Sequence, residues 1–101
     1  MSKEKSKILI VDDEPDILEI LEYNLKAAGY KVSKAKDGLE ALEKAASIQP
    51  DLILLDIMLP GMDGVEVCSR IRQNPELDQC IVAFLTARGE EFTEIAKTYI
   101  K

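Results

Sequence analysis

Short apolar runs alternate along the chain with longer stretches in which apolar residues recur every three or four positions. Continuous runs at Ile8–Val11 and Leu52–Leu55 predict strands that are covered on both faces, because a strand with one wet face would alternate. The run at Ile81–Leu85 predicts a fourth strand. Residues 30–35 do alternate and predict a strand with one wetter face. Three helical stripes lie between these strands, formed by Ile17, Leu18, Leu21, Leu25 and Ala28, then Leu39, Leu42, Ala45 and Ala46, then Val65, Cys68 and Ile71.

Turn-forming and capping residues mark the ends of the predicted helices. Pro15 suits the first residue of a helix, and Gly29 suits the position after its last turn. Asp37 is a candidate N-cap for the second helix, which Pro50 closes. A loop at 59–64 precedes the third helix, which we expect to end near residue 74.

The resulting order of strand, helix, strand, helix, strand, helix, strand predicts an α/β domain. Such alternation indicates a doubly wound parallel sheet with right-handed crossovers and helices on both faces. We expect one domain over residues 1–101. The last dozen residues fit two structures: Phe92, Ile95, Ala96 and Tyr99 have helical spacing, whereas residues 98–100 also suit a short strand.

Composition and charge narrow the classes of function. The 101 residues include 19 acidic and 13 basic side chains, and the net charge of −6 argues against nucleic-acid binding. The chain has no histidine, which excludes Ser–His and Cys–His catalysis. Cys68 and Cys80 are too far apart for a CxxC motif and are interpreted as buried thiols. No apolar run approaches the roughly 20 residues of a membrane span, so we expect no membrane contact and a cytoplasmic location.

Acidic and hydroxyl side chains follow three of the predicted strands. Asp12 and Asp13 end the first strand, Asp56 ends the third, and Thr86 ends the fourth. Ligands of open parallel sheets bind at the carboxyl ends of the strands, so these residues form one site if the first, third and fourth strands are neighbours. Three close carboxylates repel one another unless a cation intervenes, and oxygen ligands suit Mg²⁺.

An aspartate beside bound magnesium can accept a phosphoryl group, and Thr86 can donate a hydrogen bond to its oxygens. Each residue also has a plainer interpretation. Negative charge at 12–16 favours the start of a helix, and Thr86 can cap a following helix. Asp56 is less easily explained in this way, because the loop after it is unusually apolar.

Three segments resemble the receiver domains of bacterial two-component response regulators. Residues 8–14, with the sequence ILIVDDE, resemble the first strand and acidic pair of that family. Residues 51–64, DLILLDIMLPGMDG, look like its phospho-acceptor strand and loop, and residues 84–88, FLTAR, resemble its fourth strand and hydroxyl position. Residues 37–42 are also typical of its second helix, and the resemblance covers about 7–96.

The resemblance implies a flavodoxin-like fold with strand order 2-1-3-4-5. It implies that Asp56 accepts a phosphoryl group from a phosphohistidine of a sensor histidine kinase. Asp12, Asp13 and Asp56 would bind Mg²⁺, or alternatively Mn²⁺, together with the backbone carbonyl of Met58. Thr86 would hydrogen-bond the phosphoryl group and switch an output surface. Catalysis would be limited to weak self-phosphorylation and autodephosphorylation, with no external substrate.

The resemblance is incomplete at the C-terminal end, where we expect the fifth strand and fifth helix to be incomplete or absent. Lys101 is a candidate for the lysine that pairs with the phosphoryl oxygens, and Tyr99 for the switch aromatic; a solvated lysine and a packing residue are the alternatives. A receiver-like docking or dimerisation module that no longer switches is the alternative function. Further expected partners are a downstream effector domain or protein, or a second copy in a homodimer or element-swapped dimer.

Overall fold

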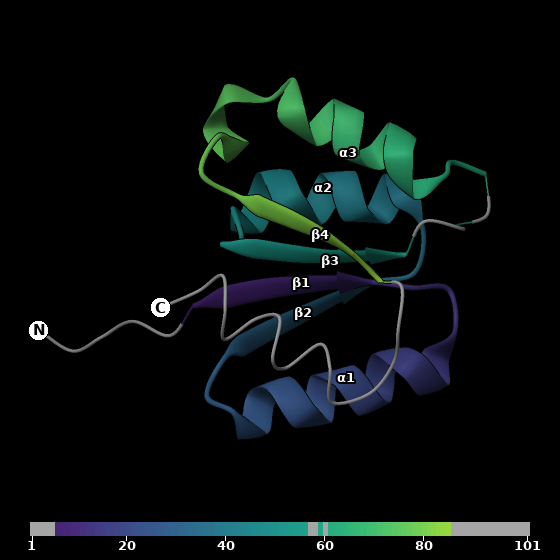
Figure 1. The fold of residues 1–101 in the computed structure, drawn as a ribbon, viewed down its shortest axis with the longest axis vertical. Helices are drawn as coiled ribbons and strands as arrows, with labels where there is room; N and C mark the ends of the chain where they lie inside the picture. Colours follow the sequence, from purple (N-terminus) through teal and green to yellow (C-terminus); the bar gives the residue numbers. More distant parts are fainter. Residues whose placement is uncertain (1–5, 57–58, 60, 86–101) are drawn as a thin grey trace, which may run out of the picture.

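The computed structural model describes residues 6–56, 59 and 61–85. Four strands and three helices alternate along this part of the chain (Figure 1). The strands are β1 (Lys7–Val11), β2 (Lys31–Ala35), β3 (Leu52–Asp56) and β4 (Ile81–Leu85). The helices are α1 (Pro15–Ala27), α2 (Gly38–Ile48) and α3 (Gly64–Arg72), and a 3₁₀ turn, η1 (Pro75–Leu77), precedes β4.

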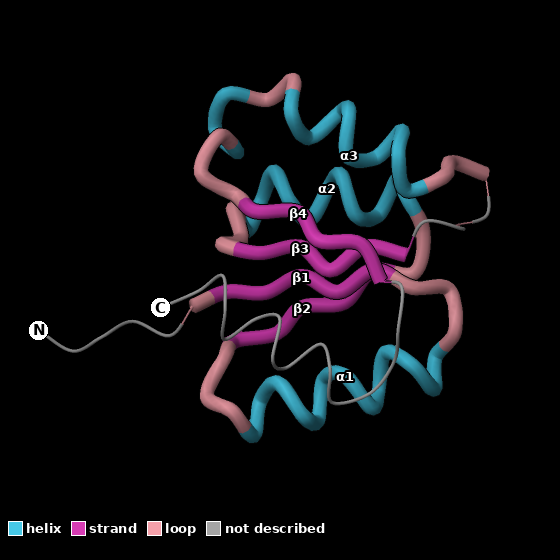
Figure 2. The backbone as a smooth tube through the Cα atoms, in the orientation of Figure 1, coloured by secondary structure: helices cyan, strands magenta, loops and turns pink. Residues whose placement is uncertain are grey.

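The strands form one parallel sheet in the order β2-β1-β3-β4. Helix α1 covers one face, and helices α2 and α3 cover the other, as Figure 2 shows. This is the doubly wound, flavodoxin-like arrangement that the sequence predicts, with the order 2-1-3-4 confirmed. The predicted fifth strand falls within residues 86–101, outside the described residues.

The sheet separates two apolar cores. On the α1 side, side chains of β1 and β3 pack against α1: Ile8, Ile10, Leu52 and Leu54 against Leu18, Leu21 and Leu25. On the other side, the alternate side chains of the same strands pack against α2 and α3: Leu9, Val11, Ile53 and Leu55 against residues that include Ala41, Ala45, Val67 and Ile71. Side chains from β1 and β3 therefore enter both cores, and all but Lys7 and Asp56 in these strands are buried. This explains why both strands are continuous apolar runs.

The helix boundaries follow local chemistry. Pro15 begins α1, and Gly29, with φ of 102°, follows its C-terminal end, as the sequence predicts. The Asp37 carboxylate caps α2 by accepting the backbone N–H of Glu40 at 2.8 Å. Helix α3 begins one residue earlier than its apolar stripe, because Asp63 caps it in the same way.

Two local predictions need correction. Tyr30 lies outside β2, since its backbone N–H bonds to the carbonyl of Leu25 and completes the end of α1. The third helix, expected to end near residue 74, ends at Arg72. Asn74 instead caps the turn η1 by accepting the backbone N–H of Glu76 at 3.0 Å, and Pro75 begins that turn.

Candidate functional site

The carboxyl ends of β1 and β3 bring acidic residues together. The register pairs Val11 of β1 with Leu55 of β3, so Asp12 and Asp56 come next on neighbouring strands. One carboxylate oxygen from each of Asp12, Asp13 and Asp56 lies within 4.8 Å of the others. The structure thus confirms that these three carboxylates meet at one edge of the sheet.

Asp12 is the buried member of this cluster, with 6% of its surface exposed. Its backbone N–H donates to the carbonyl of Ala35 at 3.1 Å, which anchors it to the end of β2. Its Oδ1 accepts the backbone N–H of Glu14 at 2.9 Å. Burial raises the pKa of the Asp12 carboxyl, and the negative charges of Asp56 and Asp13 raise this pKa further. The hydrogen bond from the Glu14 N–H lowers the same pKa and offsets part of the rise.

The other two carboxylates are more accessible. Asp13 is exposed, and Asp56 is half-buried at the end of β3. The cluster therefore opens to solvent on one side and is supported by protein on the other. Carboxylate oxygens are the donors that hard divalent cations prefer, and the unfavourable charge around Asp12 is what such a cation would relieve. The donor set fits Mg²⁺.

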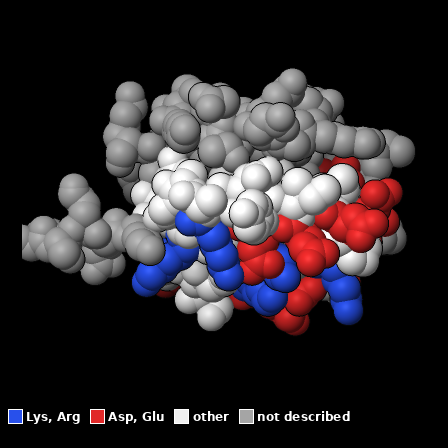
Figure 3. Space-filling model, turned by 90° about the horizontal axis from the view of Figure 1, so that it is seen from below, with Lys and Arg blue, Asp and Glu red and all other residues white. Residues whose placement is uncertain are grey.

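Acidic side chains also surround the cluster on the α1 side. Figure 3 shows that they gather toward the end of this face where the carboxyl edge of the sheet lies. Glu14 and Asp16, both exposed, lie at the N-cap and in the first turn of α1, close after the cluster residues Asp12 and Asp13. This charge attracts cations to the edge and repels free anions.

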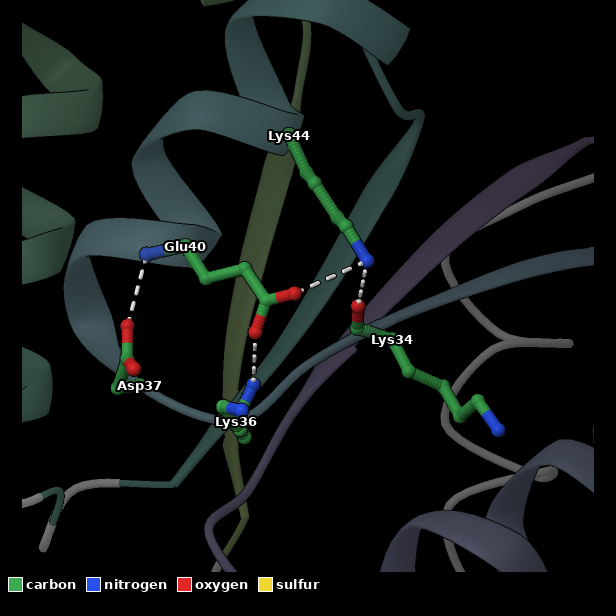
Figure 4. A network of polar contacts seen from close by, with 5 residues as sticks. All are labelled: Lys34, Lys36, Asp37, Glu40 and Lys44. Atoms are coloured by element: carbon green, nitrogen blue, oxygen red, sulfur yellow. Dashed lines mark hydrogen bonds and ion pairs between the residues drawn. The ribbon is translucent and has the colours of Figure 1, made fainter.

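A polar network fixes the connection between β2 and α2, beside the Ala35 carbonyl that holds Asp12 (Figure 4). Glu40 accepts the backbone N–H of Lys36 at 2.9 Å and pairs with the Lys44 ammonium at 3.3 Å. Lys44 also donates to the carbonyl of Lys34. The bond from Lys36, with the Lys44 pair, lowers the pKa of Glu40. This role of Glu40 was not predicted, although the Asp37-x-x-Glu40 spacing is typical of a capping motif.

Four predicted site residues lie outside the described residues: Met58, Thr86, Lys101 and Tyr99. The nearest described position to Thr86 is Leu85, the last residue of β4, which the register pairs with Asp56. The carboxyl end of β4 therefore meets the same edge of the sheet as Asp56. Cys68 and Cys80, which the sequence predicts as buried thiols, are both free. The prediction is confirmed for Cys80, whereas Cys68 is only half-buried.

The acidic cluster lies after β1 and β3 of a doubly wound α/β sheet, at the point where the strand order reverses and where proteins of this class bind their ligands. Comparison with known families is more specific. The family model described as response regulator receiver domain matches residues 8–100. The chain belongs to the response regulator receiver family of two-component systems.

Known relatives agree with this assignment. The chain is 51% identical over 89 residues to the alkaline phosphatase synthesis transcriptional regulatory protein PhoP of Bacillus subtilis (strain 168), with 88% of this chain matched. It spans 36% of the length of that relative. The relative is therefore a longer protein, of which this chain matches one part.

Solved structures share the fold. The N-terminal domain of a response regulator receiver protein from Methanoculleus marisnigri JR1 has a TM-score of 0.77 and 38% identity, covering 95% of this chain and 80% of that one. The response regulator TrrA from Thermotoga maritima, solved in complex with Mg²⁺-BeF, has a TM-score of 0.76 and 31% identity, covering 94% and 99%. Among the described helices, none is both long and apolar enough to cross a membrane.

Proposed function

We propose that residues 1–101 form one phospho-accepting receiver domain, in which Asp56 takes a phosphoryl group from a phosphohistidine of a sensor kinase. The observation that carries this proposal is the grouping of the Asp12, Asp13 and Asp56 carboxylates within 4.8 Å at the carboxyl edge of the sheet. Membership of the receiver family supports it.

The transfer is a substitution at phosphorus. A carboxylate oxygen of Asp56 forms the new P–O bond while the P–N bond of the phosphohistidine breaks. The electron pair of that bond goes to the imidazole nitrogen, and the product on this chain is an aspartyl phosphate. The chain itself has no histidine, which fits a donor on another protein.

Asp12, Asp13 and Asp56 are the residues that would hold Mg²⁺, with the backbone carbonyl of Met58 and with Mn²⁺ as the alternative ion. When bound, the cation would offset the negative charge of the carboxylates and of the phosphoryl oxygens. The related TrrA of Thermotoga maritima was solved with Mg²⁺-BeF, which supports this assignment. Asp12 contributes a buried carboxylate that accepts the backbone N–H of Glu14, and its own backbone N–H is bonded to Ala35, so the residue is positioned before any ion binds.

The remaining roles concern the switch. Thr86 follows the β4 residue paired with Asp56 and is proposed to donate its hydroxyl to a phosphoryl oxygen. Lys101 is the proposed partner of the phosphoryl oxygens, and Tyr99 the proposed switch aromatic. The readout would be a downstream effector domain or protein, as in regulators such as the longer PhoP relative, or a homodimer.

Intact-mass spectrometry after incubation with phosphoramidate and Mg²⁺ tests the acceptor. We expect one phosphoryl group on the wild-type chain, none without Mg²⁺ and none on Asp56→Asn. Asp16→Asn is the matched control, because it removes an exposed carboxylate from the first turn of α1. An unmodified wild-type chain would instead favour the non-switching docking module.

Thermal unfolding tests the cation site separately from the transfer. Beryllofluoride with Mg²⁺ should raise the unfolding temperature of the wild type, because a ligand that binds only the folded state stabilises it. The same addition should leave Asp56→Asn unchanged. Equal shifts for both chains would place the ions elsewhere.

A further inference from the structure

A surface hollow lies between the N-terminal turn of α2 and the loop before α3. It has a volume of about 440 Å³ and is lined by Asp37, Gly38, Leu39, Gly61 and Met62. These positions follow the carboxyl ends of β2 and β3, so the hollow belongs to the same edge of the sheet as the acidic cluster. None of its lining residues belongs to that cluster.

The walls of the hollow are apolar and accessible. Leu39, on the first turn of α2, is 65% exposed, and Gly61 and Met62 from the loop before α3 complete the apolar lining. Apolar side chains that line a surface hollow are typical of interaction sites.

The floor of the hollow depends on the absence of a side chain at Gly38. A Cβ atom there would lie 3.0 Å from Cγ2 of Val67 and 3.1 Å from Cβ of Met62. Glycine therefore lets the start of α2 approach the loop that carries Met62. Met62 is held against the core on the α2 and α3 side, which gives the hollow a fixed wall.

The charge around the hollow is acidic. Of the charged residues in 36–40 and 61–66, four are acidic and one, Lys36, is basic. Glu40 and Glu66 are ion-paired with Lys44 and Arg70, so the acidic charge beside the hollow comes mainly from Asp37 and Asp63. The N-terminal amides of the two helices do not offer a free anion site at their caps. Asp37 already accepts the backbone N–H of Glu40 at 2.8 Å, and Asp63 accepts that of Glu66 at 2.9 Å. The rim therefore favours cations over anions.

We propose that this hollow is a docking site for a basic segment of a partner protein, in which an apolar side chain enters between Leu39 and Met62. Flanking lysine or arginine side chains would lie against Asp37 and Asp63. A second copy of this chain is a poorer occupant, since each copy carries a net charge of −6 and an acidic rim. The proposal does not depend on phosphorylation of Asp56.

An NMR titration of the full chain with the peptide acetyl-Lys-Leu-Lys-amide tests this. We expect saturable shifts of the backbone amides of residues 37–39 and 61–62. Two control peptides should bind at least about tenfold more weakly. Acetyl-Glu-Leu-Glu-amide reverses the charge, and acetyl-Lys-Gly-Lys-amide lacks the apolar side chain.

Two sets of variants separate the contributions. Leu39→Ser should weaken binding by roughly tenfold without unfolding the chain, because its side chain is mostly exposed, whereas Ile20→Ser on α1 should have no effect. The double variant Asp37→Asn with Asp63→Asn removes two charges and keeps both caps, since asparagine is an equally good N-cap. We expect it to weaken binding by about threefold and to reduce its salt dependence.

Three results would overturn the proposal. One is equal binding of the acidic peptide, and another is an unchanged affinity in Leu39→Ser. The third is concentration-dependent dimerisation, by sedimentation velocity without peptide, that Leu39→Ser abolishes. That result would assign the hollow to a second copy.

Discussion

Asp12 and Asp56 come next after a registered pair, Val11 and Leu55, and their carboxylates lie within 4.8 Å at the edge of the sheet. Asp12 is almost fully buried, and its pKa is raised by burial and by the charges of Asp56 and Asp13. The folded state therefore holds the buried Asp12 carboxylate, which water screens poorly, close to two more accessible like charges. Such an arrangement lowers the stability of the ion-free fold and is typical of functional sites.

Replacing Asp12 by asparagine should stabilise the ion-free protein. The substitution removes a buried charge that faces two other carboxylates, and the amide oxygen can still accept the Glu14 N–H. We expect the free energy of unfolding in EDTA at neutral pH to rise by about 1 kcal/mol. Asp16→Asn, on the exposed first turn of α1, should change it by less than about 0.5 kcal/mol. Urea unfolding measures both, and a less stable Asp12→Asn would contradict the interpretation.

The elements that a short stretch of sequence determines could be predicted well. The runs at Ile8–Val11 and Leu52–Leu55 must be buried on both faces, and the structure places alternate residues of each in the two cores. Because the strands are parallel, acidic residues after β1 and β3 had to meet at one edge. That β1 and β3 are neighbours came from the resemblance to receiver domains, and the structure confirms it.

Features that depend on distant contacts could not be predicted in this way. The backbone N–H of Asp12 bonds to the carbonyl of Ala35 on another strand, and no local sequence pattern predicts that hydrogen bond. The hollow beside Leu39 exists because Gly38 lets α2 approach Met62, which is a tertiary relationship. The Asp63 cap is different, because its Asp-x-x-Glu spacing is a local pattern. That spacing begins inside a run of turn-forming residues, which by itself predicts only a loop.

Glu22 should make the free energy of unfolding depend on pH in the acidic range. Its carboxylate pairs with Lys34 at 2.8 Å and with Lys26 at 2.9 Å and so ties α1 to β2; hydrogen bonds from Lys34 and Lys26 lower its pKa below the usual 4.5. A lowered carboxyl pKa contributes stability above the unfolded-state value. That contribution is lost as the pH falls through the folded-state value.

Glu22→Gln should therefore cost roughly 0.5 kcal/mol at neutral pH, and the difference from wild type should vanish in acid. Because the pair is partly exposed, salt should also reduce the effect. Urea unfolding between neutral pH and pH 3 measures it, with the exposed Glu19→Gln on the same helix as the control. A difference that grows toward low pH would have the wrong sign.

The two cysteines should react at very different rates. Burial raises the pKa of the Cys80 thiol to about 11, and the side chain is 5% exposed, whereas Cys68 is half-buried. Iodoacetamide attacks the thiolate, so native Cys80 should be modified on the order of a hundredfold more slowly than an ordinary thiol. Peptide mapping of the native chain should find the label on Cys68. In denaturant both should react equally, and rapid native labelling of Cys80 would contradict the assigned burial.

Arg72 should hold the segment between α3 and β4. Its guanidinium donates to the carbonyl of Cys80 at 2.6 Å and to that of Leu77 at 3.2 Å, and both acceptor residues are buried. Arg72→Met leaves these two carbonyls without this donor, and we expect a loss of about 2 kcal/mol. Both bonds come from the guanidinium nitrogen Nη2, and Arg72→Lys should recover only part of the loss because Nζ on the shorter lysine side chain does not reach the position of that nitrogen.

Arg70 on the same helix provides the matched control. Its guanidinium pairs with Glu66 at 3.0 Å, but both side chains are about half exposed, so Arg70→Met should cost less than about 0.5 kcal/mol. Hydrogen exchange at the amide of Ile81, which bonds to the Asp51 carbonyl, reports where the loss falls. If Arg72 anchors the start of β4, this amide should exchange faster in Arg72→Met than in Arg70→Met. Equal exchange in the two variants would show that β4 is held without Arg72.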